Sequence, residues 1–75
     1  MGEVVMPKLS DTMEEGTIVE WLVADGETVA AGDELVEIQT DKAIATYEAE
    51  EGGVLRIHEQ VGRTVPIGAR IAELS

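Results

Sequence analysis

The sequence contains no cysteine and no phenylalanine, and it has few basic residues. Without cysteine the chain forms no disulfide and supplies no thiol chemistry of its own. Without phenylalanine we expect a core of valine, isoleucine and leucine, with Trp21 and the methionines as the larger fillers. Five bases against sixteen acids give a net charge of −11. We therefore expect neither nucleic acid nor a membrane as a partner, because both attract basic surfaces.

The sequence also lacks long apolar runs. No stretch approaches the length of a membrane-spanning helix, and the first residues lack the apolar segment of a signal peptide. At 75 residues, the chain is expected to form a single domain over 1–75. These features predict an intracellular, soluble domain, and we also expect the domain itself to be monomeric.

The second half of the sequence repeats the first at an offset of 36 residues. The residues that fall in register are glycines, threonines and apolar residues: Gly16 and Gly52, Gly26 and Gly62, Thr28 and Thr64, Val29 and Val65, Gly32 and Gly68, Leu35 and Ile71. Such a match indicates one supersecondary unit used twice, and each unit alone is too thin to bury its apolar face. We therefore expect two small sheets related by a pseudo-twofold axis. The segment 39–44, which joins the copies, is unique.

Alternating apolar residues and frequent turn signals predict an all-β fold without an amphipathic helix. In the strand expected at 17–23, the alternation predicts that Val19, Trp21 and Val23 face the core. The other expected strands are short: 4–6, 35–40, 43–49, 54–58 and 70–74. This pattern favours a small sandwich or flattened barrel, with the two termini at one end and the 39–44 segment at the other.

Lys42 lies at the apex of the hairpin predicted to join the two copies. Asp41-Lys42 is not the Asn-Gly pair that primed two-residue turns prefer, so a type I turn is expected. A lysine at this place projects away from both sheets, with no neighbour to hold its amine. From the residues alone, an ordinary polar turn residue and a functional amine both remain open. The other lysine, Lys8, follows Pro7 and has no distinctive surroundings.

Residues 9–15 form a polar segment that is typical of a surface loop. We expect this loop near the lysine end, where Asp11, Glu14 and Glu15 either contact a partner or simply face solvent. The acidic pairs lack the ligand spacing of a calcium loop, so no metal site is expected. His58 faces outward without an acid–base partner in the sequence, and no catalytic residue is expected in the chain.

The run Glu37-Ile38-Gln39-Thr40-Asp41-Lys42-Ala43, with Gly16 before it and Gly53 after it, resembles that of a lipoyl domain. Such domains belong to the dihydrolipoyl acyltransferases of 2-oxo acid dehydrogenase complexes. The stretch from Met6 to Gly16 is similar to the start of the pyruvate dehydrogenase type. The resemblance covers the whole chain and implies a flattened barrel of two four-stranded antiparallel sheets. It also implies a non-catalytic swinging-arm carrier that bears lipoic acid as an amide on Lys42.

The resemblance further implies the partners of such a carrier. A lipoate ligase or lipoyl transferase would recognise Lys42 together with the flanking Asp41 and Ala43. The arm would then shuttle acyl groups and reducing equivalents between a thiamine-dependent decarboxylase, the acyltransferase core and dihydrolipoyl dehydrogenase. The expected location is the cytoplasm of a prokaryote or the mitochondrial matrix of a eukaryote.

Three alternatives share parts of this pattern. A biotin carboxyl carrier domain has the same fold and turn lysine, but its lysine typically lies between methionines, where this chain has Asp41 and Ala43. The lipoylated carrier protein of glycine cleavage is longer and has extra helical segments. An inert β-sandwich interaction module would carry no group on Lys42.

Overall fold

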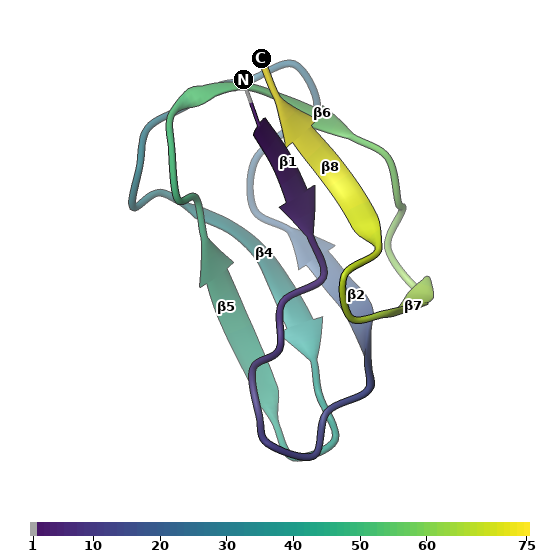
Figure 1. Ribbon diagram of the computed structural model, residues 1–75. Helices are drawn as coiled ribbons and strands as arrows, with labels where there is room; N and C mark the ends of the chain where they lie inside the picture. Colours follow the sequence, from purple (N-terminus) through teal and green to yellow (C-terminus); the bar gives the residue numbers. More distant parts are fainter. Residues whose placement is uncertain (1) are drawn as a thin grey trace.

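The computed structural model describes residues 2–75, which form eight β-strands and no helix, and hence none long and apolar enough to cross a membrane (Figure 1). In chain order these strands are β1 (Gly2–Val5), β2 (Glu15–Trp21), β3 (Thr28–Val29), β4 (Glu34–Gln39), β5 (Ile44–Glu48), β6 (Gly53–Ile57), β7 (Thr64–Pro66) and β8 (Arg70–Leu74). The expected all-β fold is confirmed. The predicted strands all appear, most of them with ends shifted by one or two residues.

The strands form two four-stranded antiparallel sheets, with the orders β1-β8-β6-β3 and β5-β4-β2-β7. Exchanging β1 with β5, β2 with β6, β3 with β7 and β4 with β8 converts one order into the other, as the sequence repeat predicts. The correspondence extends to single hydrogen bonds. The Leu22 N–H donates to the Leu35 carbonyl at 2.8 Å, and the His58 N–H donates to the Ile71 carbonyl at 2.9 Å. The two sheets pack as a flattened sandwich rather than closing into a barrel.

The core lies between the sheets and is aliphatic, as the composition predicts. Its fully enclosed side chains come from both halves of the chain: Met6, Met13, Ile18, Leu35, Val36, Ile38, Leu55 and Ile71. Gly16 makes room for the methionines, since an added Cβ there would lie 2.6 Å from the Met6 sulfur and 2.9 Å from the Met13 methyl carbon. The gap-filling role expected for Met6 and Met13 is confirmed.

The face predicted for β2 is partly wrong. Ile18 is fully buried, whereas Val19 is only partly buried. The pairing of β2 with β4 shifts register between Ile18 and Glu20, so a bulge changes which residues face the core. Beyond the bulge, Trp21 and Val23 pack against the core as predicted. Trp21 remains partly exposed, and its indole N–H donates to the Glu59 carbonyl at 2.9 Å.

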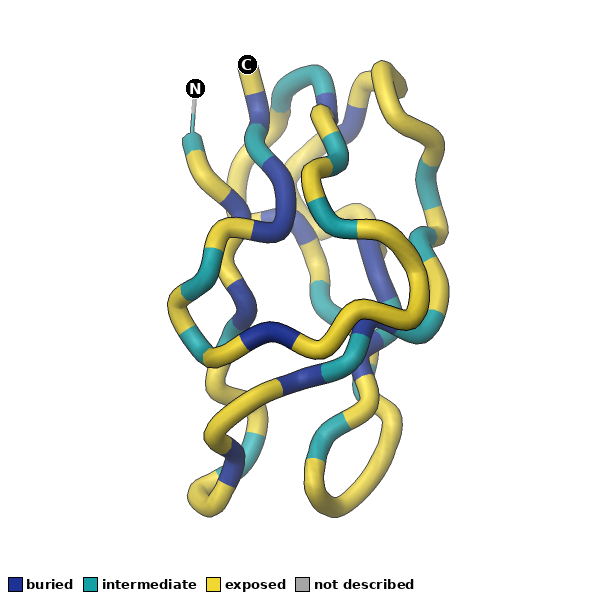
Figure 2. Tube along the Cα trace, turned by 90° about the vertical axis from the view of Figure 1, so that its right-hand side faces the viewer, coloured by how far each residue is buried: buried dark blue, intermediate teal, exposed yellow. Residues whose placement is uncertain are grey.

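The ends of the molecule differ as the pseudo-twofold axis requires. The start of β1 and the end of β8 lie at one end, and the β1–β2 loop and the β4–β5 connection lie at the other (Figure 1). Figure 2 shows that the buried residues gather in the body of the molecule, while the connections at that second end are mostly exposed. The lysine turn therefore lies at the end of the paired strands β4 and β5 that is distant from the start of β1 and the end of β8.

Candidate functional site

The lysine turn is a short connection between two well-paired strands. Ile38 pairs with Ala45 and Gln39 pairs with Ile44, which leaves residues 40–43 as the turn. The N–H of Thr40 donates to the Ala43 carbonyl at 2.8 Å. Among residues 2–75 only glycines have positive φ, so the turn is neither of the primed types that hairpins prefer. This agrees with the type I turn expected from Asp41-Lys42.

The side chain of Thr40 closes the turn from within. Its hydroxyl accepts hydrogen bonds from the N–H groups of Lys42 and Ala43, each at 3.1 Å. The same hydroxyl donates to the Ala43 carbonyl at 2.8 Å. The Thr40 side chain thus provides hydrogen-bond partners for backbone groups of the turn, which the side chains of an Asn-Gly turn are not needed to provide. The backbone that carries Lys42 is therefore fixed even though the turn is exposed.

Lys42 is exposed, as predicted, and no hydrogen bond or ion pair within residues 2–75 involves its ammonium group. Its neighbour Ala43 is also exposed and adds only a methyl group beside the lysine. An amine that is to be acylated must be reachable and free of strong partners. The residues present therefore fit a carboxylic acid attached by an amide to Lys42.

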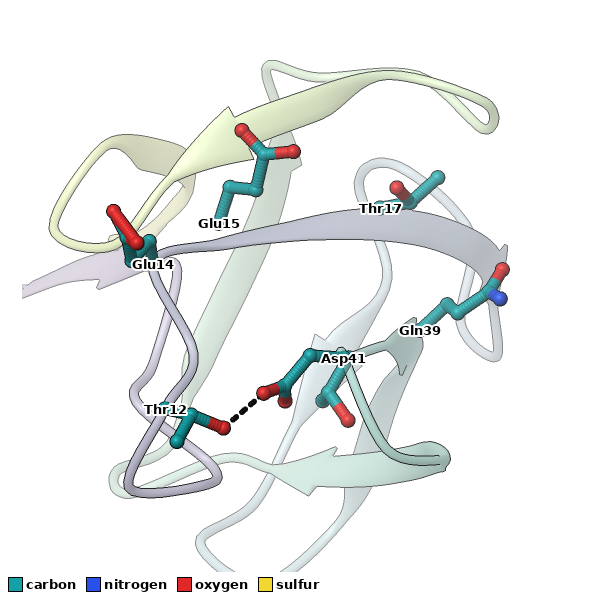
Figure 3. A pocket seen from close by; sticks show the side chains of 7 residues that line it. Thr12, Glu14, Glu15, Thr17, Gln39 and Asp41 are labelled. Atoms are coloured by element: carbon teal, nitrogen blue, oxygen red, sulfur yellow. Dashed lines mark hydrogen bonds between the residues drawn. The ribbon is translucent and has the colours of Figure 1, made fainter.

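Asp41 faces the β1–β2 loop rather than solvent alone. One carboxylate oxygen accepts a hydrogen bond from the Ser10 hydroxyl at 2.7 Å. The other accepts one from the Thr12 hydroxyl, which Figure 3 marks with a dashed line. These bonds, with that from Thr12 the larger cause, hold the pKa of Asp41 below its ordinary value, and the nearby charge of Lys42 acts in the same direction. The expectation that the 9–15 loop lies at the lysine end is confirmed.

A hollow of about 560 Å³ lies beside this contact and is lined by residues of the loop, of β2 and of the turn. Glu14 and Glu15 lie on the side of the loop and the start of β2, and Gln39 and Asp41 lie across from them (Figure 3). The structure thus brings two of the three acidic loop residues together with Asp41. Asp11 is exposed on the same loop but does not line the hollow.

Sequence reasoning missed Ser10, Thr12 and Thr40 as residues of this end of the domain. The signal for Thr40 was its place directly before the turn, where a hydroxyl can bond backbone two and three residues on. No sequence pattern indicated the bonds from the loop to Asp41, because they join residues that are 31 and 29 positions apart.

His58, for which the sequence offered no acidic partner, has one in the structure. Its Nε2 lies 3.4 Å from a carboxylate oxygen of Glu73.

The profile of the Biotin_lipoyl family, described as "Biotin-requiring enzyme", matches residues 2–74. The pyruvate dehydrogenase protein X component of Mus musculus mitochondria is 47% identical over 72 residues, covering 93% of this chain and 14% of that protein. The dihydrolipoyllysine-residue succinyltransferase component of the Bacillus subtilis 2-oxoglutarate dehydrogenase complex is 40% identical over 76 residues, covering 100% and 18%.

A solved structure gives the same result for the fold. The lipoyl domain of the 2-oxoglutarate dehydrogenase complex from Azotobacter vinelandii superposes with a TM-score of 0.80 at 29% identity, covering 100% of this chain and 96% of that chain. The chain spans less than a fifth of the length of each of the two curated relatives. It belongs to the Biotin_lipoyl family, and its fold is that of a lipoyl domain.

Proposed function

We propose that this chain is a swinging-arm carrier domain of a 2-oxo acid dehydrogenase complex and that Lys42 bears lipoic acid as an amide. One observation carries the proposal. In a lipoyl-domain fold, an exposed amine that has no hydrogen-bonding partner among residues 2–75 stands at the tip of the hairpin that joins the two halves. The likeness to components of pyruvate and 2-oxoglutarate dehydrogenase complexes supports it.

In the reaction, this chain presents the lipoyl group on Lys42 to the enzymes of the complex. Lipoic acid, when bound, supplies a cyclic disulfide that accepts an acyl group and two electrons. The sheet pair and the Thr40 hydroxyl hold the backbone at Lys42, while the long side chain stays free to move. A mobile side chain on a fixed turn makes each visit to an enzyme an intramolecular event at high effective concentration. The domain thus acts as a non-catalytic part of a dihydrolipoyl acyltransferase.

The neighbours of Lys42 have proposed roles in recognition. Asp41 and Ala43 flank the lysine, and we assign them to recognition by a lipoate ligase or lipoyl transferase. The small side chain of Ala43 supports this, since it leaves one side of the lysine open. Asp11, Glu14 and Glu15 are proposed to contact the thiamine-dependent decarboxylase, because their loop stands beside the turn.

The remaining partners follow from the same proposal. They are dihydrolipoyl dehydrogenase and the acyltransferase core of the complex, and the location is the bacterial cytoplasm or the mitochondrial matrix. Relatives from both settings support the two locations, since one is mitochondrial and another comes from Bacillus subtilis. The 2-oxo acid is proposed to be pyruvate, on the likeness of residues 6–16 to that type.

A biotin carrier is the second candidate, because the family's own description names biotin-requiring enzymes. The residues beside Lys42 favour lipoate, since biotin carriers typically have methionine in the places of Asp41 and Ala43. The curated relatives described above favour it as well.

Enzymatic loading tests the proposal against this rival. The purified chain is incubated either with lipoate ligase, lipoate and ATP or with biotin protein ligase, biotin and ATP. Intact mass should show one lipoyl group and no biotin. A pyruvate-type decarboxylase with pyruvate should then add an acetyl group to the lipoylated chain. Loading with biotin alone would favour a carboxylase, and loading with neither would leave an interaction module.

A further inference from the structure

We propose that Asp41 is a positioning residue whose carboxylate fastens the 9–15 loop to the lysine turn. The fastened loop, rather than Asp41 itself, is then what the decarboxylase meets beside Lys42. This inference rests on the function proposed above. It adds that Ser10 and Thr12 act as hydrogen-bond donors and Asp41 as their acceptor, and that together they position the loop.

The geometry of the carboxylate carries the first step. Both oxygens of Asp41 are engaged, one by the Ser10 hydroxyl and one by the Thr12 hydroxyl. The two donors lie on either side of Asp11, which is exposed and forms no hydrogen bond or ion pair within residues 2–75. Two bonds to one carboxylate therefore hold the loop on both sides of Asp11.

The loop has a second, separate anchor in the core. Met13 is 2% exposed, and its N–H donates to the Ser10 carbonyl at 3.3 Å. The N–H of Leu9 lies 3.2 Å from the Met13 sulfur. Because Met13 is held by burial, loss of the bonds to Asp41 should free the tip of the loop without unfolding the domain.

The turn is likewise independent of the fastening. The Thr40 hydroxyl closes it through the N–H groups of Lys42 and Ala43 and through the Ala43 carbonyl. Removing the loop's bonds should therefore leave Lys42 displayed as before. A variant that lacks the Ser10 and Thr12 hydroxyls is therefore expected to accept lipoate normally and to be a poorer substrate for the decarboxylase.

The experiment separates a direct role of Asp41 from this positioning role. In the double variant Ser10→Ala/Thr12→Val the carboxylate of Asp41 remains in place, but both donors are gone. In Asp41→Asn the charge is gone and both donors remain. Glu20→Gln is the matched control, since it removes one exposed carboxylate of β2 that forms no hydrogen bond or ion pair within residues 2–75.

Three readouts are taken on each chain. Amide hydrogen exchange at Leu9 and Met13 reports the loop without any need for lipoate. Intact mass after treatment with lipoate ligase reports loading at Lys42. Steady-state kinetics with a pyruvate-type decarboxylase give the KM for the lipoylated domain and the kcat.

The proposal predicts faster exchange in the loop and a higher KM for the decarboxylase in both variants, with the larger change in the double variant, because the side-chain amide oxygen of Asp41→Asn still accepts one hydrogen bond. In the double variant, exchange at the two amides should rise about tenfold, as expected for lost hydrogen bonds to a charged group. For the lipoylated chains, KM should rise and kcat should stay within about twofold, because only the approach of the decarboxylase has changed. Loading of the double variant should be complete, because it keeps Asp41 and Ala43 beside Lys42. Glu20→Gln should behave as the parent chain.

Other outcomes would overturn the proposal. If the double variant exchanges and reacts like the parent while Asp41→Asn reacts poorly, Asp41 contacts the decarboxylase directly. If Glu20→Gln has the same effect, the cause is net charge. A parent chain that takes no lipoate would refute the proposed function instead, and the exchange data would still decide whether the fastening exists.

Discussion

Gly26 and Gly62 lie 36 residues apart and share one left-handed backbone conformation, with φ of 89° and 94°. Each turns the chain just before the short strand of its half, β3 or β7. An added Cβ at either position would meet no atom within 4 Å. The backbone conformation, and not a lack of space, therefore requires glycine at both places.

Alanine at these two positions should destabilise the domain to the same degree. Gly26→Ala and Gly62→Ala are each expected to lower the free energy of unfolding by about 1–2 kcal/mol, the cost of placing a Cβ in a left-handed conformation. Asparagine should cost less, because it tolerates this region better. Urea unfolding followed by tryptophan fluorescence measures the effect. If the free energy of unfolding fell in only one of the two alanine variants, the two halves would not be equivalent.

The core should show the same equivalence. Leu35 and Ile71 occupy matching positions, and both are fully buried. Leu35→Ala and Ile71→Ala should each lower the free energy of unfolding by about 2–5 kcal/mol, because each leaves a cavity between the sheets. Val61 is 58% exposed, so Val61→Ala should change stability by no more than about 0.5 kcal/mol. Thermal unfolding measures the stability of all three variants. If Leu35→Ala were as stable as the parent, Leu35 would not belong to the core.

Removal of the Thr40 hydroxyl should impair modification more than folding. Thr40→Val deletes the three hydrogen bonds that close the turn. The rate of lipoylation is expected to fall several-fold, while Thr40→Ser, which keeps a hydroxyl, should restore most of it. Thr46→Val on the adjacent strand β5 is the control, since Thr46 is exposed there. A time course by intact mass measures the rates. Equal rates for Thr40→Val and the parent would show that ligase recognition does not need the ordered turn.

The loop contact should respond to acid. The pKa of Asp41 is lowered from 3.8, first by the hydrogen bond from Thr12 and then by that from Ser10. A carboxyl whose pKa is lowered by folding stabilises the folded state fully above its ordinary pKa and loses this contribution as the pH falls through the lowered value. The stability difference between the parent and Asp41→Asn should therefore be constant near neutral pH and shrink below pH 3.8. Unfolding curves recorded across this pH range measure the stability difference. A difference that grows on acidification would show that folding does not lower the pKa of Asp41.

The repeat in the sequence made most of the fold predictable. Glycines and apolar residues in register, such as Gly26 with Gly62, defined two equivalent units and hence the positions of the termini and of the lysine turn. The inward face of β2 was partly missed because the bulge after Ile18 shifts the alternation, and a period of two cannot reveal an extra residue. Met13 sits in a polar segment, so its burial was predicted from its residue type rather than from the pattern around it.

The candidate site was less predictable than the fold. The place and exposure of Lys42 followed from the repeat and the turn residues. The bonds from Ser10 and Thr12 to Asp41 did not, because they join segments that only the packing of the two sheets brings together. A hydroxyl or a carboxylate in a sequence shows what it can bond, but not which of many partners the fold will supply.

Site mapping tests the central claim most directly. The parent chain, Lys42→Ala and Lys8→Ala are each co-expressed with a lipoate ligase, and their intact masses are compared. The account predicts a single lipoyl increment on the parent and on Lys8→Ala, and none on Lys42→Ala, because only Lys42 stands at the tip of the hairpin that joins the two halves. An increment that survives in Lys42→Ala, or one that is lost in Lys8→Ala, would contradict it.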